Sequence, residues 1–491
     1  MNSTKKRYWY KEGIWYELYI NLFYDSNNDG IGDIPGIIAK IPYLKKLGVD
    51  TLLILPFFPS TMKDYGYDIT DYYNIREELG DIEQFKTLVK TLQDNDIRVV
   101  IDLVMNHTSF EHPWFKQSER NIGKYKDYYL WEKNIDKFND NDILFNSEES
   151  SNWEYSKKRH EYYFHKFYKY QADLNWKNPL VFNEFLEIIS FYINIGVSGF
   201  RIDAAPFLIK DSKYNTNYKE SIKIIKKLKD KVTLLNKDVI FITEVPDSLK
   251  TVLNFFKSNQ MSFNFDLMPR LLLSIKEEDK KYLEKKLPLY ERIINENQFG
   301  NFLRNHDSIS LNSLSKKERI LYFKKLNSNN SKVIFSGEIV ERLISVFDDN
   351  IDKVILAYAI LLVLSGTPII YMGDERGQKE INQRNYTDGR MIVRGKILWN
   401  ENIAEIFEEM SVIISMRKEY IVDIVYSDIK INEKTPLLSF KKNNLVFLFN
   451  LQKVDVEIEN KGRIIYKRNI TIMAHKIIIK EFGILFFEEL V

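Results

Sequence analysis

The chain has 491 residues, 44% of them hydrophobic and 29% charged, which excludes a disordered or low-complexity protein. Its 71 Lys and Arg residues and 69 Asp and Glu residues give a net charge of +2, so electrostatics offer no case for binding nucleic acid or an acidic membrane surface. The chain contains no cysteine, which excludes disulfides, thiol catalysis and thiolate metal sites.

Roughly the first 400 residues alternate between short apolar runs and helical patterns. The strand-like runs include 52–55, 99–101, 199–202, 239–242 and 368–371, and helical spacing is clear at 82–92 and 221–235. Continuous apolar strands separated by helices are typical of a parallel sheet covered on both faces. The number of these units favours an α/β fold of the (β/α)₈ TIM barrel type over a doubly wound sheet.

Two segments break this alternation. Residues 108 to about 172 are rich in Tyr, Trp, Asn and Lys and are too long for an ordinary βα loop, so they predict an inserted subdomain after the third strand. From about residue 420, short β-like runs joined by polar turns predict a small all-β C-terminal domain. We therefore expect barrel residues at 1–107 and 174–419, the inserted subdomain at 108–173 and the β domain at 420–491.

The chain shows no membrane or targeting signal of the usual kinds. Basic residues near the N-terminus are not followed by an apolar segment, so we expect no signal peptide. The run at 354–372 is about long enough to span a membrane, but Gly366 and Pro368 interrupt it and Asp374 follows at once. A buried helix, a turn and a buried strand explain it better. We expect a cytoplasmic protein with no membrane or nucleic-acid partner, and the sequence does not indicate an oligomeric state.

Polar side chains follow four of the apolar runs, at the ends of strands where barrels carry their catalytic groups. They are Asp102, Asn106 and His107 after 99–101, Arg201 and Asp203 at 199–203, Glu244 after 239–242, and Asn305, His306 and Asp307 after 302–303. Any one of these ends could be explained by a helix cap or an ion pair. Four such ends in one candidate barrel favour an active site, because their side chains would converge on one mouth.

The residue types at these ends suit one kind of chemistry. Two carboxylates flanking a bond can cleave a glycoside, one acting as a protonated acid and the other in its ionised form. Arg201 lies two residues before Asp203, on the same strand face, and is expected to keep that carboxylate ionised. His107 and His306 are candidates for hydrogen bonds to sugar hydroxyls.

The same segments resemble a known family. Residues 102–107 (DLVMNH), 199–204 (GFRIDA), Glu244 and 302–307 (FLRNHD) resemble the four ordered signature regions of the α-amylase superfamily, glycoside hydrolase family 13. Residues 171–175 and 64–68 resemble two further segments of that family. The resemblance implies a retaining enzyme built on a (β/α)₈ barrel.

Carried over by position, the resemblance implies a role for each residue. Asp203 is the nucleophile that forms a β-glucosyl ester, Glu244 is the general acid and then the base, and Asp307 stabilises the distorted, oxocarbenium-like state. The implied substrate-binding residues are Asp64, Tyr67, His107, Phe164, Gln171, Arg201, His306 and Arg394. The aromatic insertion at 108–172 is expected to form a lid over the pocket, with Phe164 and Tyr163 as candidate walls. Asp388, Arg390 and Arg394 lie where the far side of the bond is often contacted. Retention predicts that the Asp203 and Glu244 carboxyls lie about 5–5.5 Å apart.

A candidate metal loop lies at 25–33. Oxygen-bearing side chains stand at positions 1, 3, 5 and 9 with Gly at 6, as in the first part of an EF-hand, although position 12 is Gly36 and an Asx-rich turn is the alternative. The resemblance implies a structural Ca²⁺ held by Asp25, Asn27, Asp29, the Ile31 carbonyl and Asp33. In the family, positions like Asn106 and Asp173 can hold a second Ca²⁺. We do not expect this second site, because a further acidic ligand of some relatives would fall near Lys210, which is not acidic.

Beyond the motifs, residues 7 to about 400 resemble the trehalose synthases of this superfamily, which isomerise maltose to trehalose within one closed active site that excludes water. The expected partner is a small α-glucoside, maltose or a short oligosaccharide. Departures from the family pattern at 376–399 leave open an α-glucosidase acting on short malto- or isomalto-oligosaccharides. A non-catalytic scaffold or transport subunit is disfavoured, because Asp203, Glu244 and Asp307 are all present.

Overall fold

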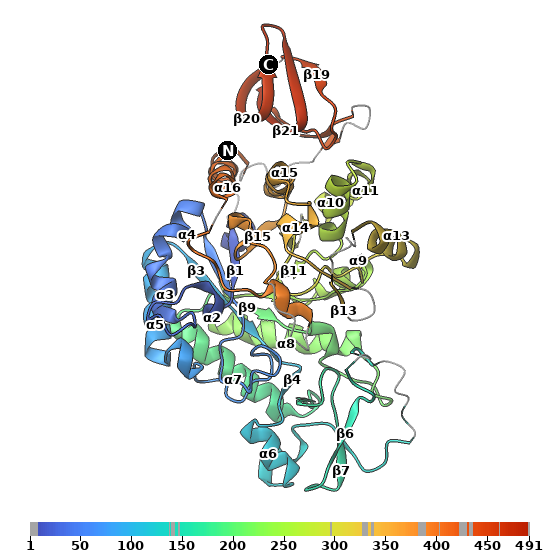
Figure 1. Cartoon of the computed structure of the whole chain (residues 1–491). Coiled ribbons are helices and arrows are strands. Elements are labelled where there is room, and N and C mark those ends of the chain that lie inside the picture. The colour runs from blue at the N-terminus through green and yellow to red at the C-terminus, as the bar shows by residue number, and fades with distance from the viewer. Residues whose placement is uncertain are drawn as a thin grey trace.

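A central barrel carries an inserted subdomain at one end and a β-sheet domain at the other (Figure 1). This computed structural model describes residues 8–136, 138, 143–145, 148–294, 297–326, 332–334, 338–381, 389–401, 403–421, 430–431, 436–460 and 462–489.

Eight parallel strands close into a barrel, which confirms the predicted (β/α)₈ fold. In spatial order they are β1 (Trp15–Leu18), β15 (Thr367–Tyr371), β12 (Gln298–Phe302), β11 (Met261–Phe263), β10 (Ile240–Thr243), β9 (Gly199–Ile202), β3 (Arg98–Leu103) and β2 (Thr51–Ile54). Apart from Arg98 every residue of these strands is buried, as expected of a sheet covered on both faces. All eight carboxyl ends therefore open on the same mouth.

Helices surround the barrel. The main ones are α3 (Ile34–Ala39), α4 (Ile41–Leu47), α5 (Ile82–Asp94), α7 (Pro179–Ile195), α8 (Tyr218–Leu235), α9 (Leu249–Phe255), α10 (Leu267–Lys276), α12 (Leu287–Ile294), α13 (Lys316–Leu326), α15 (Ile351–Val363) and α16 (Ala404–Met416). Short helices are α1 (Trp9–Glu12), α2 (Ile20–Phe23), α6 (Pro113–Glu119), α11 (Lys281–Glu284), α14 (Leu343–Val346), η1 (Glu77–Leu79), η2 (Gly123–Asp127), η3 (Ala205–Phe207), η4 (Asp374–Arg376), η5 (Gly389–Val393) and η6 (Arg417–Ile421). In α5, a capping box between Asp81 and Gln84 fixes the start, and the apolar residues predicted from the spacing face the barrel.

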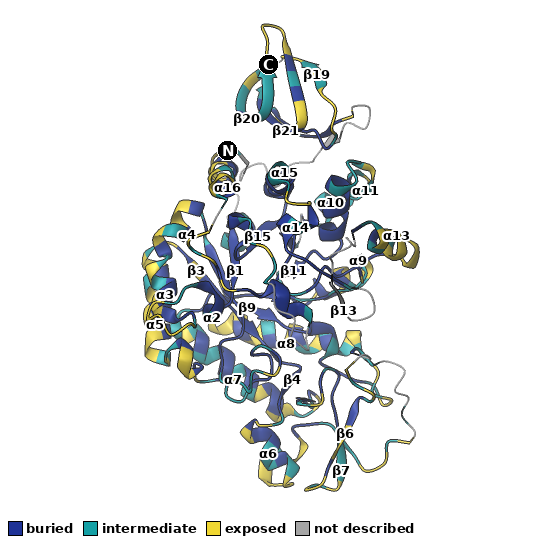
Figure 2. Cartoon of the chain, in the orientation of Figure 1, coloured by how far each residue is buried: buried dark blue, intermediate teal, exposed yellow. Residues whose placement is uncertain are grey.

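The long apolar run at 354–372 forms the buried helix α15, a turn at Gly366 with φ of +113°, and the strand β15, as predicted. In Figure 2, α15 lies between the barrel and the C-terminal sheet, and its residues from Lys353 to Val363 are buried. None of the described helices is both long and apolar enough to cross a membrane. The cytoplasmic location stays a prediction.

The inserted subdomain leaves the barrel after β3. Its base is an antiparallel pair of β4 (His107–Ser109) and β8 (Gln171–Asp173), at the expected ends of the insertion. Above the base, β5 (Trp131–Glu132), β7 (Glu161–Phe164) and β6 (Trp153–Ser156) form a small sheet. Rings form much of its core, including Phe115 stacked on Trp131 with centroids 5.5 Å apart, which explains the aromatic composition of this segment.

The C-terminal domain is an antiparallel sheet of β16 (Lys430–Ile431), β17 (Leu438–Lys442), β18 (Leu445–Phe449), β19 (Val456–Glu459), β20 (Gly462–Ile472) and β21 (Lys476–Glu489), which confirms the predicted all-β domain. A second small pair, β13 (Lys332–Ile334) and β14 (Glu338–Val340), lies within the barrel region and was not predicted. Ile309 donates a backbone hydrogen bond of 2.7 Å to the Ile339 carbonyl, which ties β14 to the segment after β12.

Candidate active site

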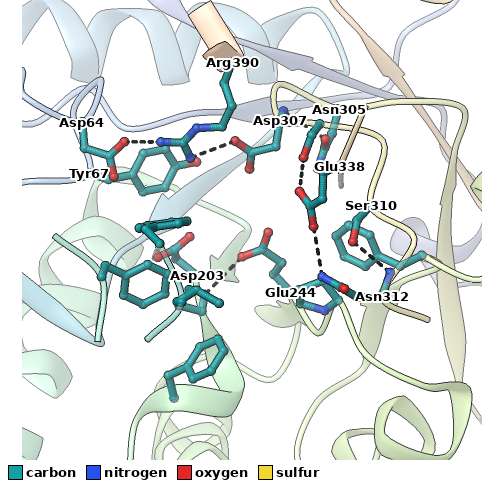
Figure 3. Close-up of a pocket in the computed structure, with 18 of the residues that line it drawn as sticks. Asp64, Tyr67, Asp203, Glu244, Asn305, Asp307, Ser310, Asn312, Glu338 and Arg390 are labelled. Carbon is teal, nitrogen blue, oxygen red and sulfur yellow. Dashed lines mark hydrogen bonds and ion pairs between the residues drawn. The ribbon is translucent and has the colours of Figure 1, made fainter. Parts of the chain in front are cut away.

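A cavity of about 380 Å³ lies at the carboxyl ends of the barrel strands. Its polar walls include Asp64, Tyr67, Asp203, Glu244 and Asp307 (Figure 3), together with His107. Its phenylalanine walls are Phe145, Phe167, Phe207 and Phe265. The four strand ends singled out in the sequence therefore meet at one pocket.

One guanidinium connects the two carboxylates expected to carry the chemistry. Arg201 on β9 is almost fully buried, and its Nη1 donates to Asp203 at 2.8 Å and to Asp102 at 2.5 Å. Its Nη2 pairs with Glu244 at 2.9 Å. Ala204 turns the chain sharply with a φ of +48°, and its backbone N–H donates to Glu244 at 3.2 Å. The positive φ of this non-glycine residue is a local strain that brings a backbone donor to the site.

That Arg201 keeps Asp203 ionised stays a prediction, because Arg201 lowers the pKa of Asp203 while other groups oppose it. Burial raises the pKa of Asp203 well above its ordinary value; Arg201 lowers that pKa, but the negative charges of Glu244, Asp102 and Asp307 raise it further. Three carboxylates around one guanidinium exceed the charge that the arginine can balance. The cluster as a whole therefore favours keeping a proton, which is what general-acid catalysis requires.

Asp307 has a different environment. Its carboxylate accepts from Arg394 at 2.5 Å and from Arg390 at 3.3 Å, and lies 3.2 Å from His306 Nε2. Burial alone would raise the pKa of Asp307, but His306, Arg394 and Arg390 outweigh it and hold that pKa well below its ordinary value. Asp307 is thus a fixed negative charge at the pocket wall.

His306 is held between two acids. Its Nδ1 lies 2.7 Å from Glu17, and its Nε2 faces Asp307 and the Tyr67 hydroxyl. Burial lowers the pKa of His306, but Asp307 and Glu17 raise it to about 9, so the ring is an imidazolium at neutral pH. His306 therefore holds the lining residues Asp307 and Tyr67 in position through its Nε2 contacts with both.

Arg390 closes one end of the pocket. Its guanidinium donates to Asp64 at 2.7 Å and to Asp307 at 3.3 Å, joining the two carboxylates across the mouth (Figure 3). Gln171 donates to the other oxygen of Asp64 at 2.8 Å. Arg390 and Arg394 thus contact Asp64 and Asp307, and their place on the far side of the bond stays a prediction. Asp388 lies outside the described residues.

His107 presents an atom that points to a ligand. Its Nε2 is buried and has no hydrogen-bond partner within the described structure. Burial lowers the pKa of His107 to about 4, so the ring is neutral at pH 7 and its free nitrogen can bond a hydroxyl. Tyr67 lines the same wall, and its hydroxyl donates to Asp102 at 2.8 Å.

Phe164 is not a wall of this pocket, contrary to the prediction. Pairing of β7 with β6 sets Phe164 opposite Trp153, and its ring stacks on Tyr214 with centroids 5.4 Å apart. Two phenylalanines of the insertion, Phe145 and Phe167, line the cavity instead, and the Phe167 and His107 ring centroids lie 5.2 Å apart. The residue order in the lid did not reveal which ring faces inward, because the strand register decides it.

In the loop at 25–33 the oxygen ligands are engaged with their own backbone. Asp25 accepts from the N–H groups of Asn28 and Gly30, and Asp29 accepts from Ile31. Asp33 caps α3 by accepting from Gly36. Among the described residues, no three Asp, Glu or His side chains form a metal-binding group. The Ca²⁺ assignment therefore stays a prediction, although every donor is an oxygen of the kind that Ca²⁺ prefers.

Lys210 contacts Asn106 and Asp173, the two positions that resemble the family's second Ca²⁺ site. Its ammonium donates to Asn106 Oδ1 at 3.0 Å and forms a short contact with Asp173. Lys210 and Asp173 are both fully buried. A protein cation here joins the barrel to the base of the lid.

The alpha-amylase catalytic domain family matches residues 17–338, which include the barrel mouth described above. The chain belongs to the alpha-amylase family. It is 34% identical over 382 residues to the trehalose synthase/amylase of Mycolicibacterium smegmatis, covering 76% of this chain and 64% of that protein. It is 35% identical over 399 residues to the trehalose synthase of Thermus thermophilus, covering 80% of this chain but 41% of that protein.

This family member also matches a glucosidase over a shorter range. It is 46% identical over 208 residues, 42% of this chain and 36% of the relative, to the oligo-1,6-glucosidase of Parageobacillus thermoglucosidasius. Among solved structures, the alpha-amylase of H. orenii superposes with a TM-score of 0.79 at 25% identity, over 98% of this chain and all of that one. The chain spans less than two thirds of the length of the first trehalose synthase relatives that it matches.

Proposed function

We propose that this protein isomerises maltose to trehalose through a glucosyl ester on Asp203. The observation that carries the proposal is the contact of Arg201 with both Asp203 and Glu244 at the base of a pocket whose wall holds the negative charge of Asp307. The trehalose synthase relatives, at 34% and 35% identity, favour this activity among those of the family.

The proposed first step forms the ester. An Asp203 oxygen bonds to C1 of the terminal glucose, the C1–O bond to the leaving glucose breaks, and Glu244 gives its proton to that oxygen. In the second step the anomeric hydroxyl of the released glucose attacks C1, its proton passes to Glu244, and the bond to Asp203 breaks. Asp307 stabilises the positive charge that develops on the sugar ring in both steps.

The closed end of the pocket supports the use of a terminal glucose. Arg390 ties Asp64 to Asp307, so the space beside Asp203 ends at this bridge. Phe167 and Phe207 add apolar cover next to His107 and Asp203. A pocket of this form would hold one glucose and keep water away from the ester, and attack by water would give two glucoses instead of trehalose.

The decisive experiment is product analysis with maltose. We expect trehalose as the main product and a little glucose, resolved by chromatography. Asp203→Asn should lower the rate by about 10³- to 10⁶-fold while the protein folds normally. An unchanged rate in that variant would show that Asp203 is not the nucleophile, and inactivity of the wild type on every α-glucoside would favour a scaffold or transport subunit.

An α-glucosidase is the second candidate, favoured by the 46% identity with an oligo-1,6-glucosidase over 208 residues. The same two carboxylates would act, with water as the acceptor in the second step. Glucose as the sole product from maltose would establish this alternative. A comparison of α-1,4- and α-1,6-linked disaccharides would then define the linkage.

We also propose that the loop at 25–33 binds a structural Ca²⁺. Asp25, Asn27, Asp29 and Asp33 supply side-chain oxygens and Ile31 a carbonyl, the ligand chemistry that suits this ion. Thermal unfolding measured in EDTA and then in excess Ca²⁺ tests it. We expect Ca²⁺ to raise the Tm of the wild type and not that of Asp29→Ala; the same Tm in both solutions would contradict the proposal.

A further inference from the structure

The pocket holds a fourth carboxylate that the proposed chemistry does not use. Glu338, the first residue of β14, lines the cavity together with Glu244 and Asp307. The next residue, Ile339, is fixed by its backbone hydrogen bond from Ile309. Glu338 is therefore placed by the fold and is not a side chain that happens to reach the site.

Neutral donors hold this carboxylate. Ser308 donates to Oε2 in a short hydrogen bond, and Asn312 Nδ2 donates to Oε1 at 3.0 Å. The nearby guanidiniums pair with other carboxylates, Arg390 with Asp64 and Asp307 and Arg394 with Asp307, although the charge of Arg390 lowers the pKa of Glu338. Burial raises the pKa of Glu338, the hydrogen bond from Ser308 opposes this, and the charge of Asp307 adds to it. The carboxyl group accepts hydrogen bonds from a hydroxyl when it is ionised and can donate one when it is protonated.

Its place relative to Glu244 indicates which sugar it meets. In Figure 3, Glu244 lies between Asp203 and Glu338, and Asp64 and Tyr67 lie on the opposite side. Glu244 protonates the oxygen of the leaving sugar, so that sugar lies on the Glu244 side of the broken bond. The wall formed by Ser308, Ser310, Asn312 and Glu338 faces that space.

We propose that Glu338 binds hydroxyl groups of the leaving sugar and keeps that sugar in place as the acceptor for the second step. This inference rests on the proposed glucosyl transfer. Ser308 and Asn312 fix the carboxylate, and its remaining lone pairs are available to the sugar. A bound sugar competes with water for the ester, so Glu338 would favour isomerisation over hydrolysis.

Two substrates separate this role from a general loss of activity. Maltose has a leaving glucose with hydroxyls for Glu338, whereas the nitrophenol of p-nitrophenyl α-D-glucoside has none. We expect Glu338→Gln and Glu338→Ala to lower kcat/KM for maltose about 10- to 100-fold, the loss typical of a hydrogen bond to a charged group. Nitrophenol release should change less than about threefold, and glucose should form a larger share of the maltose products.

Glu83→Gln is the matched control, because Glu83 is exposed on α5 and pairs with Lys86 far from the pocket. The glutamine variant keeps the size of Glu338 if the alanine variant fails to fold, and Tm measurements report on folding. Equal losses on both substrates, or no loss on maltose, would overturn the inference. If the wild type makes only glucose from maltose, the isomerase proposal fails, while the contrast between the two substrates still decides the role of Glu338. A wild type that turns over neither substrate overturns both.

Discussion

Single residues in the pocket are distinguished by the charges around them. Asp203 shares one arginine with two other carboxylates, so burial and like charges raise its pKa, whereas Asp307 is surrounded by His306, Arg394 and Arg390, and its pKa falls. The carboxyl cluster around Arg201, which includes Glu244, therefore favours keeping a proton, whereas Asp307 is a fixed negative charge. Asp307, to which the proposed mechanism gives the stabilisation of the transition state, thus stays charged at neutral pH.

His306 predicts a specific pH dependence of stability. Its folded pKa of about 9 exceeds the ordinary value of 6.5, so its contribution is complete below about pH 6.5 and disappears as pH rises through 9, a change of about 3 kcal/mol. The lowered pKa of Asp307 has the opposite sign: its contribution is present above the ordinary aspartate pKa and is lost as pH falls through the folded one. Urea unfolding between pH 6 and 10 should show the loss in the wild type.

His306→Asn should be less stable than the wild type at pH 7, because Asp307 and Glu17 lose their partner. Its stability should then change little between pH 6.5 and 9. A variant whose unfolding free energy falls in parallel with that of the wild type over this range would show that another group titrates.

Phe167 and Phe164 form a matched pair in the lid. Phe167 lines the cavity beside His107, and Phe164 packs on Tyr214 and Trp153. We expect Phe167→Leu to raise the share of glucose among the maltose products several-fold, because water gains access to the ester. Phe164→Leu should cost roughly 1–3 kcal/mol of stability and leave the product ratio unchanged. The reverse pattern would restore Phe164 as a pocket wall.

The residues of the motifs were predictable because each sits at the end of an apolar strand, and the barrel fold brings all such ends together. Phe164 was misplaced because strand register directs a side chain of the lid, and residue spacing does not reveal that register. Glu338 was missed for a related reason, since it begins a strand of three residues that no motif marks.

At the scale of elements, the lid is joined to the barrel by a buried charge pair. β8 carries Asp173 at the lid base, and Lys210 follows the helix η3 on the barrel side. The barrel strands β2, β3, β9, β10 and β15 were predictable from apolar runs, but β1 was not singled out. The strand β11 has only three residues and the pair β13–β14 interrupts the barrel pattern, so neither stands out from its surroundings. Such short elements are stabilised by tertiary contacts and not by local pattern.

Lys210→Met should loosen the lid. It leaves the Asp173 carboxylate buried without a cation, which typically costs about 3–5 kcal/mol, whereas a Lys210→Met/Asp173→Asn double variant should recover much of the loss. Thermal unfolding and limited proteolysis of residues 108–173 measure both effects. Lys177→Met serves as the control, because Lys177 is exposed in the same region. Equal protease sensitivity in the single and double variants would contradict the paired-charge explanation.

At the scale of the whole molecule, the C-terminal sheet is part of the barrel core. Its strands alternate, so that Leu445, Phe447 and Phe449 of β18 pack into the core that includes α15, while Val446 and Leu448 belong to a second core on the other face. Polar contacts add to this interface: Arg468 pairs with Asp352 and Glu405 at 2.6 Å each. The predicted β domain therefore covers the barrel as well as folding on itself.

Removal of residues 422–491 should cause aggregation, and Arg468→Ala should not. The truncation exposes the buried apolar face of α15, and each large side chain that loses its cover costs about 1.5–3 kcal/mol. The arginine variant removes ion pairs whose acidic partners are partly exposed, each worth about 1 kcal/mol or less. Size-exclusion chromatography and thermal unfolding distinguish the two. A truncated chain that stays monomeric with the wild-type Tm would mean that the sheet does not stabilise the barrel.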